Sequence, residues 1–301
     1  MPIPANGQVE GLLVVEAAAP GARARLVEQL PVLSDLAAFA GSLLAPGLEG
    51  RRRASAVAGA IRQTIAAGAF SPVFQPIVEL ASGAVVGYEA LTRFADGTPP
   101  DALFAAARAA GLGLELEVAT LEAALAAETV LPAGTYLSLN ASPELILSGR
   151  LAPLLATRTR QLVLEVTEHV VIEDYTALRR AFAALEPPVR LAVDDVGAGY
   201  ASLRHVLELA PDFVKLDGGL VRGVDADLAR QALIVGIGYF AVRRKIWLIA
   251  EAIETTAELA TLRALGIPYG QGYLFGHPQD GRGSGPWPTH IRVSTHDGDP
   301  G

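Results

Sequence analysis

Short apolar runs that end in polar side chains recur along this chain and restrict what it can fold into. Seven of them read VVGYEA, TYLSLN, QLVLEV, RLAVDD, FVKL, IWLIAE and YGQG. The polar residues at or just beyond their C-terminal ends are Glu89, Asn140, Glu165, Asp194, Asp195, Lys215, Glu251 and Gln271. Polar residues delivered from many strand ends are how a barrel builds an active site. A charge beside a buried strand also needs a partner or a metal.

From Phe70 onward, these apolar runs alternate with helical segments, which predicts an α/β fold. The expected strands are 70–80, 85–91, 135–140, 161–166, 190–194, 213–217, 246–251 and 269–275, and the expected helices are 101–110, 114–128, 174–185, 202–209, 229–244 and 256–266. Eight strands with intervening helices predict a (β/α)8 TIM-like barrel rather than an open doubly wound sheet. The first two strands are joined by only residues 81–84, too few for a parallel crossover, so one strand is expected to be antiparallel.

The two ends of the chain differ from this pattern. Residues 1–50 hold one predicted strand, 11–16, and one amphipathic helix, 32–44, which is too little for a domain. They resemble the last strand and closing helix of a GAF-type sensory domain, and a helical extension packed on the barrel is the alternative. We expect a linker helix over 51–67, the barrel over 68–279, and a disordered tail over 280–301, which is rich in Gly, Pro and polar residues.

Composition narrows the classes of function. The net charge of −8 argues against a broad surface for a nucleic-acid polymer. The absence of cysteine excludes thiolate nucleophiles and cysteine metal sites. The longest apolar stretch, 232–242, is far shorter than the roughly 20 residues of a membrane span, so we expect no membrane segment. The N-terminus lacks the features of a secretory signal, and we expect a cytoplasmic protein.

Asp194 and Asp195, directly after the apolar LAV, are the sharpest local feature. Adjacent carboxylates at a strand end point in different directions, so one can bridge two cations while the other binds one of them. Ligation by carboxylate and amide oxygens suits Mg²⁺ or Mn²⁺ and disfavours zinc. Two such ions about 3.5–4 Å apart would hold a phosphodiester and activate a water. Taken alone, a pair of aspartates is more often a turn or a helix cap, but the other polar strand ends favour the metal site.

Several motifs in order resemble the EAL-domain family of cyclic-di-GMP phosphodiesterases over about residues 70–279. The matching segments are Phe74-Gln75-Pro76-Ile77, Tyr88-Glu89-Ala90-Leu91-Thr92-Arg93, Leu139-Asn140 with Ser142-Pro143, Leu164-Glu165-Val166-Thr167-Glu168, Asp194-Asp195-Val196-Gly197-Ala198-Gly199-Tyr200, Val214-Lys215-Leu216-Asp217, Ala250-Glu251-Ala252-Ile253-Glu254 and Gln271-Gly272-Tyr273. A single EAL string carries little information, whereas the ordered set is specific.

The resemblance implies a role for each matched residue. One divalent cation would be bound by Glu89, Asn140, Glu165 and Asp194, and a second by Asp194, Asp195 and Glu251. Lys215 would polarise the attacking water, and two neighbouring cations would lower its pKa. The substrate would contact Gln75, Leu91, Arg93 and Gln271, with the Arg93 guanidinium on a phosphate. A structural ion pair is the alternative for Arg93. Glu168 and Glu254 would support the loop after Asp195.

The resemblance implies an enzyme that hydrolyses cyclic di-GMP to linear pGpG, using two Mg²⁺ or Mn²⁺ ions, as a homodimer controlled by an N-terminal sensory region. Two departures leave an alternative open: Val196 replaces the family's usual Phe, and Ala252 its usual Gly. The alternative is a weak or inactive receptor or adaptor that binds cyclic di-GMP or a protein partner. A different metal-dependent barrel hydrolase is a third interpretation.

Overall fold

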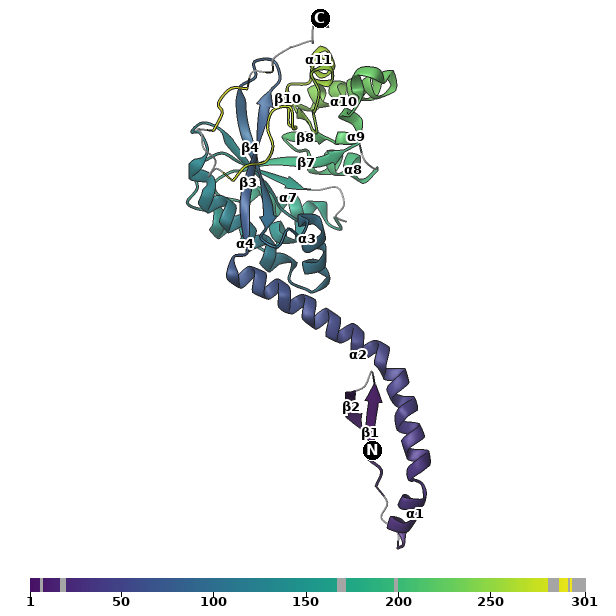
Figure 1. The fold of residues 1–301 in the computed structure, drawn as a ribbon. Coiled ribbons are helices and arrows are strands. Elements are labelled where there is room, and N and C mark those ends of the chain that lie inside the picture. Colours follow the sequence, from purple (N-terminus) through teal and green to yellow (C-terminus); the bar gives the residue numbers. More distant parts are fainter. Residues whose placement is uncertain are drawn as a thin grey trace, which may run out of the picture. The chain divides into compact units, whose positions relative to one another are not determined.

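A computed structural model describes residues 1–5, 8–16, 20–166, 172–197, 200–280, 287–291 and 293. The chain divides into two compact units, residues 1–63 and 64–301 (Figure 1). Each unit is described by itself below.

The first unit consists of a hairpin and helices. Strands β1 (Pro2–Ala5) and β2 (Gln8–Leu12) pair antiparallel, and helix α1 (Ala22–Glu28) precedes the 38-residue helix α2 (Leu30–Ala67), which continues into the second unit. A Cβ atom at Gly41 of α2 would lie 1.9 Å from the Pro4 carbonyl oxygen, so only glycine lets the hairpin backbone lie against the helix. The strand begins earlier than predicted, and the two predicted helices, 32–44 and 51–67, are one.

Helix α2 also bears on the expectation of no membrane segment. An 18-residue window in it has a mean hydropathy of 1.3, and only 11% of that window is buried. Among the described residues it is the one helix long and apolar enough to cross a membrane by length and composition. Core helices of soluble proteins and signal sequences can have the same length and composition. The expectation of no membrane segment considered only uninterrupted apolar stretches, and Ser34 and Asp35 interrupt the apolar part of this helix.

The second unit is a closed eight-stranded barrel, as predicted. Its strands, in spatial order, are β10 (Tyr269–Gly270), β3 (Phe70–Glu79), β4 (Val85–Phe94), β5 (Tyr136–Asn140), β6 (Leu162–Val166), β7 (Arg190–Val196), β8 (Phe213–Leu216) and β9 (Trp247–Ala250). Strand β3 is antiparallel to both β10 and β4, and the remaining neighbours are parallel. The prediction of a barrel with one reversed strand is confirmed. Only the last strand is much shorter than expected.

Helices connect the parallel strands and surround the barrel (Figure 1). They are α3 (Pro100–Ala109), α4 (Gly113–Ala127), α5 (Pro143–Leu147), α6 (Leu151–Leu155), α7 (Tyr175–Ala183), α8 (Tyr200–Leu209), α9 (Gly218–Val221), α10 (Leu228–Arg244) and α11 (Thr256–Ala264), with 3-10 turns at Glu128–Val130 and Val224–Ala226. The short α5, α6 and α9 were not predicted, because helices of four or five residues carry too few positions for a periodic pattern.

The barrel interior is apolar at one level and polar at the next. A small buried cluster of Ile77, Val163, Ala192, Phe213 and Ile249 fills it, with the Tyr136 ring packed against them. Side chains alternate along a strand, so in β5 the next inward positions after Tyr136 are Ser138 and Asn140. The polar residues of the site therefore stand above an apolar floor that excludes water from below.

Residues 287–291 contact the barrel, although they fall within the predicted disordered tail, 280–301. Residues 287–291, here called the C-terminal strap, pair with the β3–β4 hairpin: the Val85 amide donates to the Thr289 carbonyl at 3.0 Å and the Ile291 amide to the Gly83 carbonyl at 2.8 Å. In Figure 1 the yellow C-terminal segment runs beside β3 and β4. The sequence did not predict this contact, because a single tryptophan in a Gly- and Pro-rich stretch produces no periodic pattern. Residues 281–286, 292 and 294–301 lie outside the described residues.

Candidate active site

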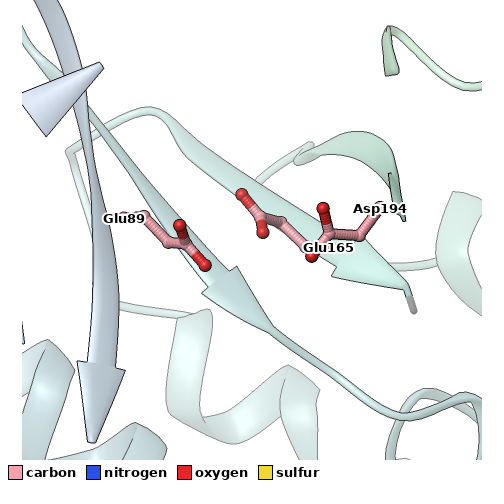
Figure 2. Close-up of side chains that lie close together, drawn as sticks. All are labelled: Glu89, Glu165 and Asp194. Carbon is pink, nitrogen blue, oxygen red and sulfur yellow. The ribbon is translucent and has the colours of Figure 1, made fainter. Parts of the chain in front are cut away.

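The barrel brings the predicted polar residues together: Gln75 and Glu89 lie mid-strand, and the others lie within two residues of the carboxyl ends of their strands. Gln75 comes from β3, Glu89 from β4, Asn140 from β5, Glu165 from β6, Asp194 and Asp195 from β7 and Lys215 from β8, while Glu251 and Gln271 directly follow β9 and β10. The pairing register sets Glu89 opposite Gln75 and Asn140 opposite Glu165. Figure 2 shows the carboxylates of Glu89, Glu165 and Asp194 lying close together.

Two groups of carboxylates share Asp194. In the first, single oxygen atoms of Glu89, Glu165 and Asp194 all lie within 4.8 Å of one another. In the second, oxygen atoms of Asp194, Asp195 and Glu251 meet the same limit. These are the same acidic residues that the family resemblance assigned to two cation sites. Asn140 adjoins the first group, because its side-chain amide donates to Glu89 Oε1 at 3.1 Å.

A bulge explains how two consecutive residues of β7 can serve one site. Adjacent residues of a regular strand point to opposite faces. The β7–β8 register shifts between Val193 and Val196, and Asp195 has a φ of 56°. A β-bulge re-aims side chains, and a non-glycine residue with positive φ is a strained conformation often found at functional sites. The bulge therefore lets both carboxylates face the interior.

Lys215 lies at the centre of the acidic residues. Its ammonium nitrogen is 2.7 Å from Glu165 Oε2, 2.7 Å from Glu251 Oε1, 3.2 Å from Asp194 Oδ1 and 3.4 Å from Glu89 Oε2. The lysine side chain is 1% exposed. A buried ammonium requires negatively charged partners, and the buried carboxylates in turn require a positive charge beside them.

The charges of the site do not balance. Glu89, Glu165, Asp194, Asp195 and Glu251 are five carboxylates against the single ammonium of Lys215. Burial and the neighbouring Glu89 charge hold the pKa of Glu165 well above its usual range, although Lys215 opposes them. Burial likewise raises the pKa of Glu251 to about 8, against the opposing charge of Lys215. Burial acts the same way on Glu89, but Lys215 and hydrogen bonds from Gln271 and Asn140 outweigh it and lower that pKa.

These surplus carboxylates fit hard divalent cations. Closely spaced, buried oxygen ligands that would otherwise hold protons are the donor set that Mg²⁺ and Mn²⁺ prefer. Burial opposes the charge of Lys215, but Asp194, Glu165 and the other carboxylates prevail and raise its pKa well above the ordinary value. The predicted depression of that pKa therefore applies only to a site in which cations neutralise the carboxylates.

Two glutamines connect the first carboxylate group to the place where β10 pairs with β3, here called the barrel seam. The Gln271 side chain donates to Glu89 Oε2 at 2.6 Å and to Gln75 Oε1 at 2.9 Å, and the Gln75 amide donates to the Gly276 carbonyl at 3.1 Å. Both glutamines are buried. At Gly272, a Cβ atom would lie 2.2 Å from the Ile253 carbonyl oxygen, so glycine permits the close turn that follows Gln271.

The other predicted residues lie at the margin or outside the description. Leu91 is half-buried and Arg93 is exposed near the end of β4. Among the described residues Arg93 forms no ion pair, so its alternative structural role gains no support. Glu254 is paired with Arg222 at 3.6 Å. Glu168 lies outside the described residues.

Sequence reasoning missed two residues that hold the site. The Ser138 hydroxyl donates to Glu165 Oε1 at 2.5 Å. Glu117 of α4 accepts from the Ser142 amide at 2.5 Å and hydroxyl at 2.7 Å, and so holds the turn after Asn140. The alternation of β5 could have identified Ser138. Nothing in the sequence pairs Glu117 with a residue 25 positions away.

The sequence of residues 58–278 matches the EAL domain family, so the chain belongs to that family. The probable cyclic di-GMP phosphodiesterase PdeN of Escherichia coli K12 is 28% identical over 225 residues, which cover 69% of this chain and 43% of PdeN. The cyclic di-GMP phosphodiesterase PdeL of the same organism is 27% identical over 228 residues, covering 70% of this chain and 63% of PdeL. The chain thus spans less than two thirds of either relative.

Solved structures of the family resemble the barrel. BlrP1 of Klebsiella pneumoniae, solved with cyclic di-GMP and with calcium or manganese, has a TM-score of 0.63 and 31% identity and covers 70% of this chain and 56% of that one. A standalone EAL protein of Vibrio cholerae O395 in its c-di-GMP-bound form has a TM-score of 0.61 and 27% identity, covering 70% of this chain and 93% of that one.

The two departures from the family pattern lie beside the site. Val196 is 1% exposed and lines an apolar groove of about 310 Å³ between α8 and α10. Ala252 has a φ of 53°, a conformation that glycine adopts without strain. Its Cβ atom lies beside Gly218, where an added Cβ would be 2.8 Å away.

Proposed function

We propose that this chain is a cyclic-di-GMP-specific phosphodiesterase that hydrolyses cyclic di-GMP to linear pGpG with two Mg²⁺ or Mn²⁺ ions. The observation that carries the proposal is the two carboxylate groups that share Asp194 around Lys215. Membership of the EAL domain family supports it, as do relatives named as phosphodiesterases of this nucleotide.

The cation ligands follow from the two groups. Glu89, Asn140, Glu165 and Asp194 would hold one ion, and Asp194, Asp195 and Glu251 the other. Bound there, the ions would neutralise the phosphodiester charge and acidify a water. The carboxylates are already held by Ser138, Gln271 and Lys215, so little reorganisation is needed to receive the ions.

The reaction requires a water oxygen to attack phosphorus while the bond from phosphorus to the 3′ oxygen breaks in line. The 3′ oxygen takes up a proton, and the phosphate stays on the 5′ side of the linear product. Lys215 is buried within 3.4 Å of four carboxylates and so reaches a water that they surround. Its role is to orient that water and to move a proton.

The substrate would lie across the open end of the barrel. Gln75 and Gln271 would contact it from the seam, and Leu91 and Arg93 from β4. The exposed guanidinium of Arg93 offers two parallel donors to one phosphate, a geometry that lysine cannot reproduce.

The test is incubation of the purified chain with cyclic di-GMP and Mg²⁺ or Mn²⁺, followed by nucleotide chromatography. We expect pGpG as the product, with no turnover of cyclic di-AMP. Glu89→Gln should abolish turnover, while Glu115→Gln, an exposed carboxylate on α4, serves as the matched control. If neither the wild type nor the folded Glu115→Gln control forms pGpG at saturating Mn²⁺, the proposal is rejected.

A receptor that binds without hydrolysis is the second candidate, and the strained Ala252 beside Glu251 is the observation that favours it. The same incubation separates the two candidates when it is combined with calorimetry. Nucleotide binding with micromolar affinity but no pGpG would identify a receptor.

We also propose that the chain acts as a homodimer through the faces of α8 and α10, with residues 1–63 as a regulatory region. Leu207, Leu233, Tyr239 and Val242 are each at least 50% exposed there, beside the groove that Val196 lines. Large exposed apolar patches mark interaction sites. Tyr239→Glu should produce a monomer by light scattering, whereas Val130→Glu, at an exposed valine elsewhere on the barrel, should not.

A further inference from the structure

The C-terminal strap lies beyond residues 58–278, the part of the chain that matches the family. We propose that Trp287 of this strap is a positioning residue: it clamps the outer face of the β3–β4 hairpin and thereby fixes Glu89 and Gln75 inside the barrel. The proposal rests on the proposed function, because it takes Glu89 as a cation ligand.

Trp287 packs edge-on against one aromatic ring from each strand of the hairpin. Its ring centroid is 5.0 Å from that of Tyr88 on β4 and 6.0 Å from that of Phe74 on β3. The Tyr88 hydroxyl donates to the Pro288 carbonyl at 2.7 Å. Tyr88 and Phe74 are both fully buried. Aromatic contacts of this geometry contribute beyond the area they bury.

The two rings beneath Trp287 adjoin the two site residues in sequence. Successive side chains of a strand point to opposite faces. Tyr88 therefore faces outward and Glu89 inward, and likewise Phe74 faces outward and Gln75 inward. Gln75 and Glu89 are directly opposite in the register. Inside the barrel Gln271 bonds to both of them. The same short piece of hairpin is thus held from within by Gln271 and from outside by Trp287.

This hairpin is connected differently from the parallel strands. Each parallel neighbour is reached through a crossover containing a helix, whereas β3 and β4 are joined by a tight turn. The strap supplies backbone contacts along that turn, at Gly83 and Val85, and Gln279 pairs with Phe74 by two further backbone bonds. A strand held this way has less freedom to slide or twist.

Cation ligands tolerate little displacement, since functional groups must be held within about 0.5 Å of their working positions. Glu89 accepts one bond from Asn140 and one from Gln271, and a shift of its backbone would break both. Loss of the Trp287 ring should therefore weaken cation binding more than it slows the chemistry at saturating cation.

The experiment compares Trp287→Ala, Trp287→Phe and Trp247→Ala in the full chain. Trp247 is a matched control, because it is the other tryptophan, packs edge-on against Tyr269 with ring centroids 5.8 Å apart, and adjoins none of the proposed ligands in sequence. Calorimetric titration with Mn²⁺ in the absence of nucleotide measures cation affinity, and turnover of cyclic di-GMP against Mn²⁺ concentration separates affinity from kcat. We expect Trp287→Ala to weaken Mn²⁺ binding at least fivefold with kcat at saturation within twofold, Trp287→Phe to restore most of the affinity, and Trp247→Ala to leave it unchanged.

Equal Mn²⁺ affinity in wild type and Trp287→Ala would overturn the proposal, even if the melting temperature fell. If Trp287→Ala does not fold, Tyr88→Phe decides: a loss of Mn²⁺ affinity in that variant supports the clamp, and unchanged affinity overturns it. Should wild type bind no Mn²⁺, the proposed function itself fails, an outcome distinct from equal binding by both proteins.

Discussion

Gly218 and Ala252 provide the sharpest test of packing beside the site. Gly218 begins α9 after β8, and Ala252 follows Glu251 in the neighbouring connection. A Cβ atom at Gly218 would be 2.8 Å from the Ala252 Cβ, closer than two non-bonded carbon atoms can approach. The two positions therefore have room for one methyl group between them, and it is on the residue that carries the positive φ.

The magnitudes follow from this geometry. Gly218→Ala adds an overpacking cost of roughly 1–3 kcal/mol, offset in part by about 0.5–1 kcal/mol from removing a helical glycine. Ala252→Gly relieves about 1–2 kcal/mol of left-handed strain and gives back roughly 0.4–1 kcal/mol through the freer unfolded chain. We expect the first variant to lose about 1–2 kcal/mol and the second to gain up to about 1 kcal/mol. In the double variant the clash is absent, so the effects of the two substitutions on the free energy of unfolding should differ from additivity by about 2 kcal/mol, the coupling free energy.

The assay is urea unfolding of wild type, both single variants and the double variant, followed by tryptophan fluorescence. Both tryptophans, at 247 and 287, belong to the barrel unit, so the signal reports that unit alone. Gly236→Ala is the control, because it is also in a helix but a Cβ there meets nothing within 4 Å. It should combine additively with Ala252→Gly. A coupling below about 0.5 kcal/mol between 218 and 252, the range of independent sites, would refute the reasoning.

Four further predictions concern the site. Chelation should abolish turnover, and Mg²⁺ or Mn²⁺ but not Ca²⁺ should restore it, since Ca²⁺ acidifies water poorly; full activity in excess chelator would contradict the two-ion mechanism. Lys215→Ala should lower kcat by at least 100-fold (~2.7 kcal/mol) with little change in nucleotide affinity. Steady-state kinetics and calorimetry measure the two quantities, and an unchanged kcat would contradict the role of Lys215. With chelator present, the melting temperature should fall as pH rises from 6 to 9, because Glu251, with a pKa of about 8, binds a proton in the folded chain that the unfolded chain has already released. Glu251→Gln should reduce this slope, and an unchanged slope would assign it to another group. Val196→Phe should stabilise the barrel by about 1 kcal/mol, because the groove of about 310 Å³ that Val196 lines can accept the ring, whereas a lower melting temperature would mean overpacking.

The sequence predicted the barrel and the acidic residues for one physical reason. The carboxyl ends of neighbouring parallel strands meet at one end of the barrel, so residues such as Glu165, Asp194 and Lys215 are brought together by topology alone, without knowledge of side-chain packing. The reversed strand was predicted equally well, because the length of the 81–84 connection decides it.

What the sequence could not predict depends on contacts between distant segments. Glu117 reaches Ser142 across a helix–strand connection, and Trp287 reaches Tyr88 across 199 positions of sequence. No local pattern encodes such pairs. The continuous α2 was missed for another reason: Pro46 and four glycines within it argue locally for interruptions that the structure does not contain.

The reversal of β3 also decides where the N-terminal region joins the barrel. In an all-parallel barrel the chain enters its first strand at the face remote from the catalytic loops. Here α2 leads directly into Phe70, which pairs with Phe94, and the Ala95 amide donates to the Ala69 carbonyl at 2.9 Å. Entry is therefore beside Arg93, at the mouth of the site. A rotation at the end of α2 would reach Arg93, the proposed phosphate contact, through four residues and one hydrogen bond, without being transmitted through the barrel floor.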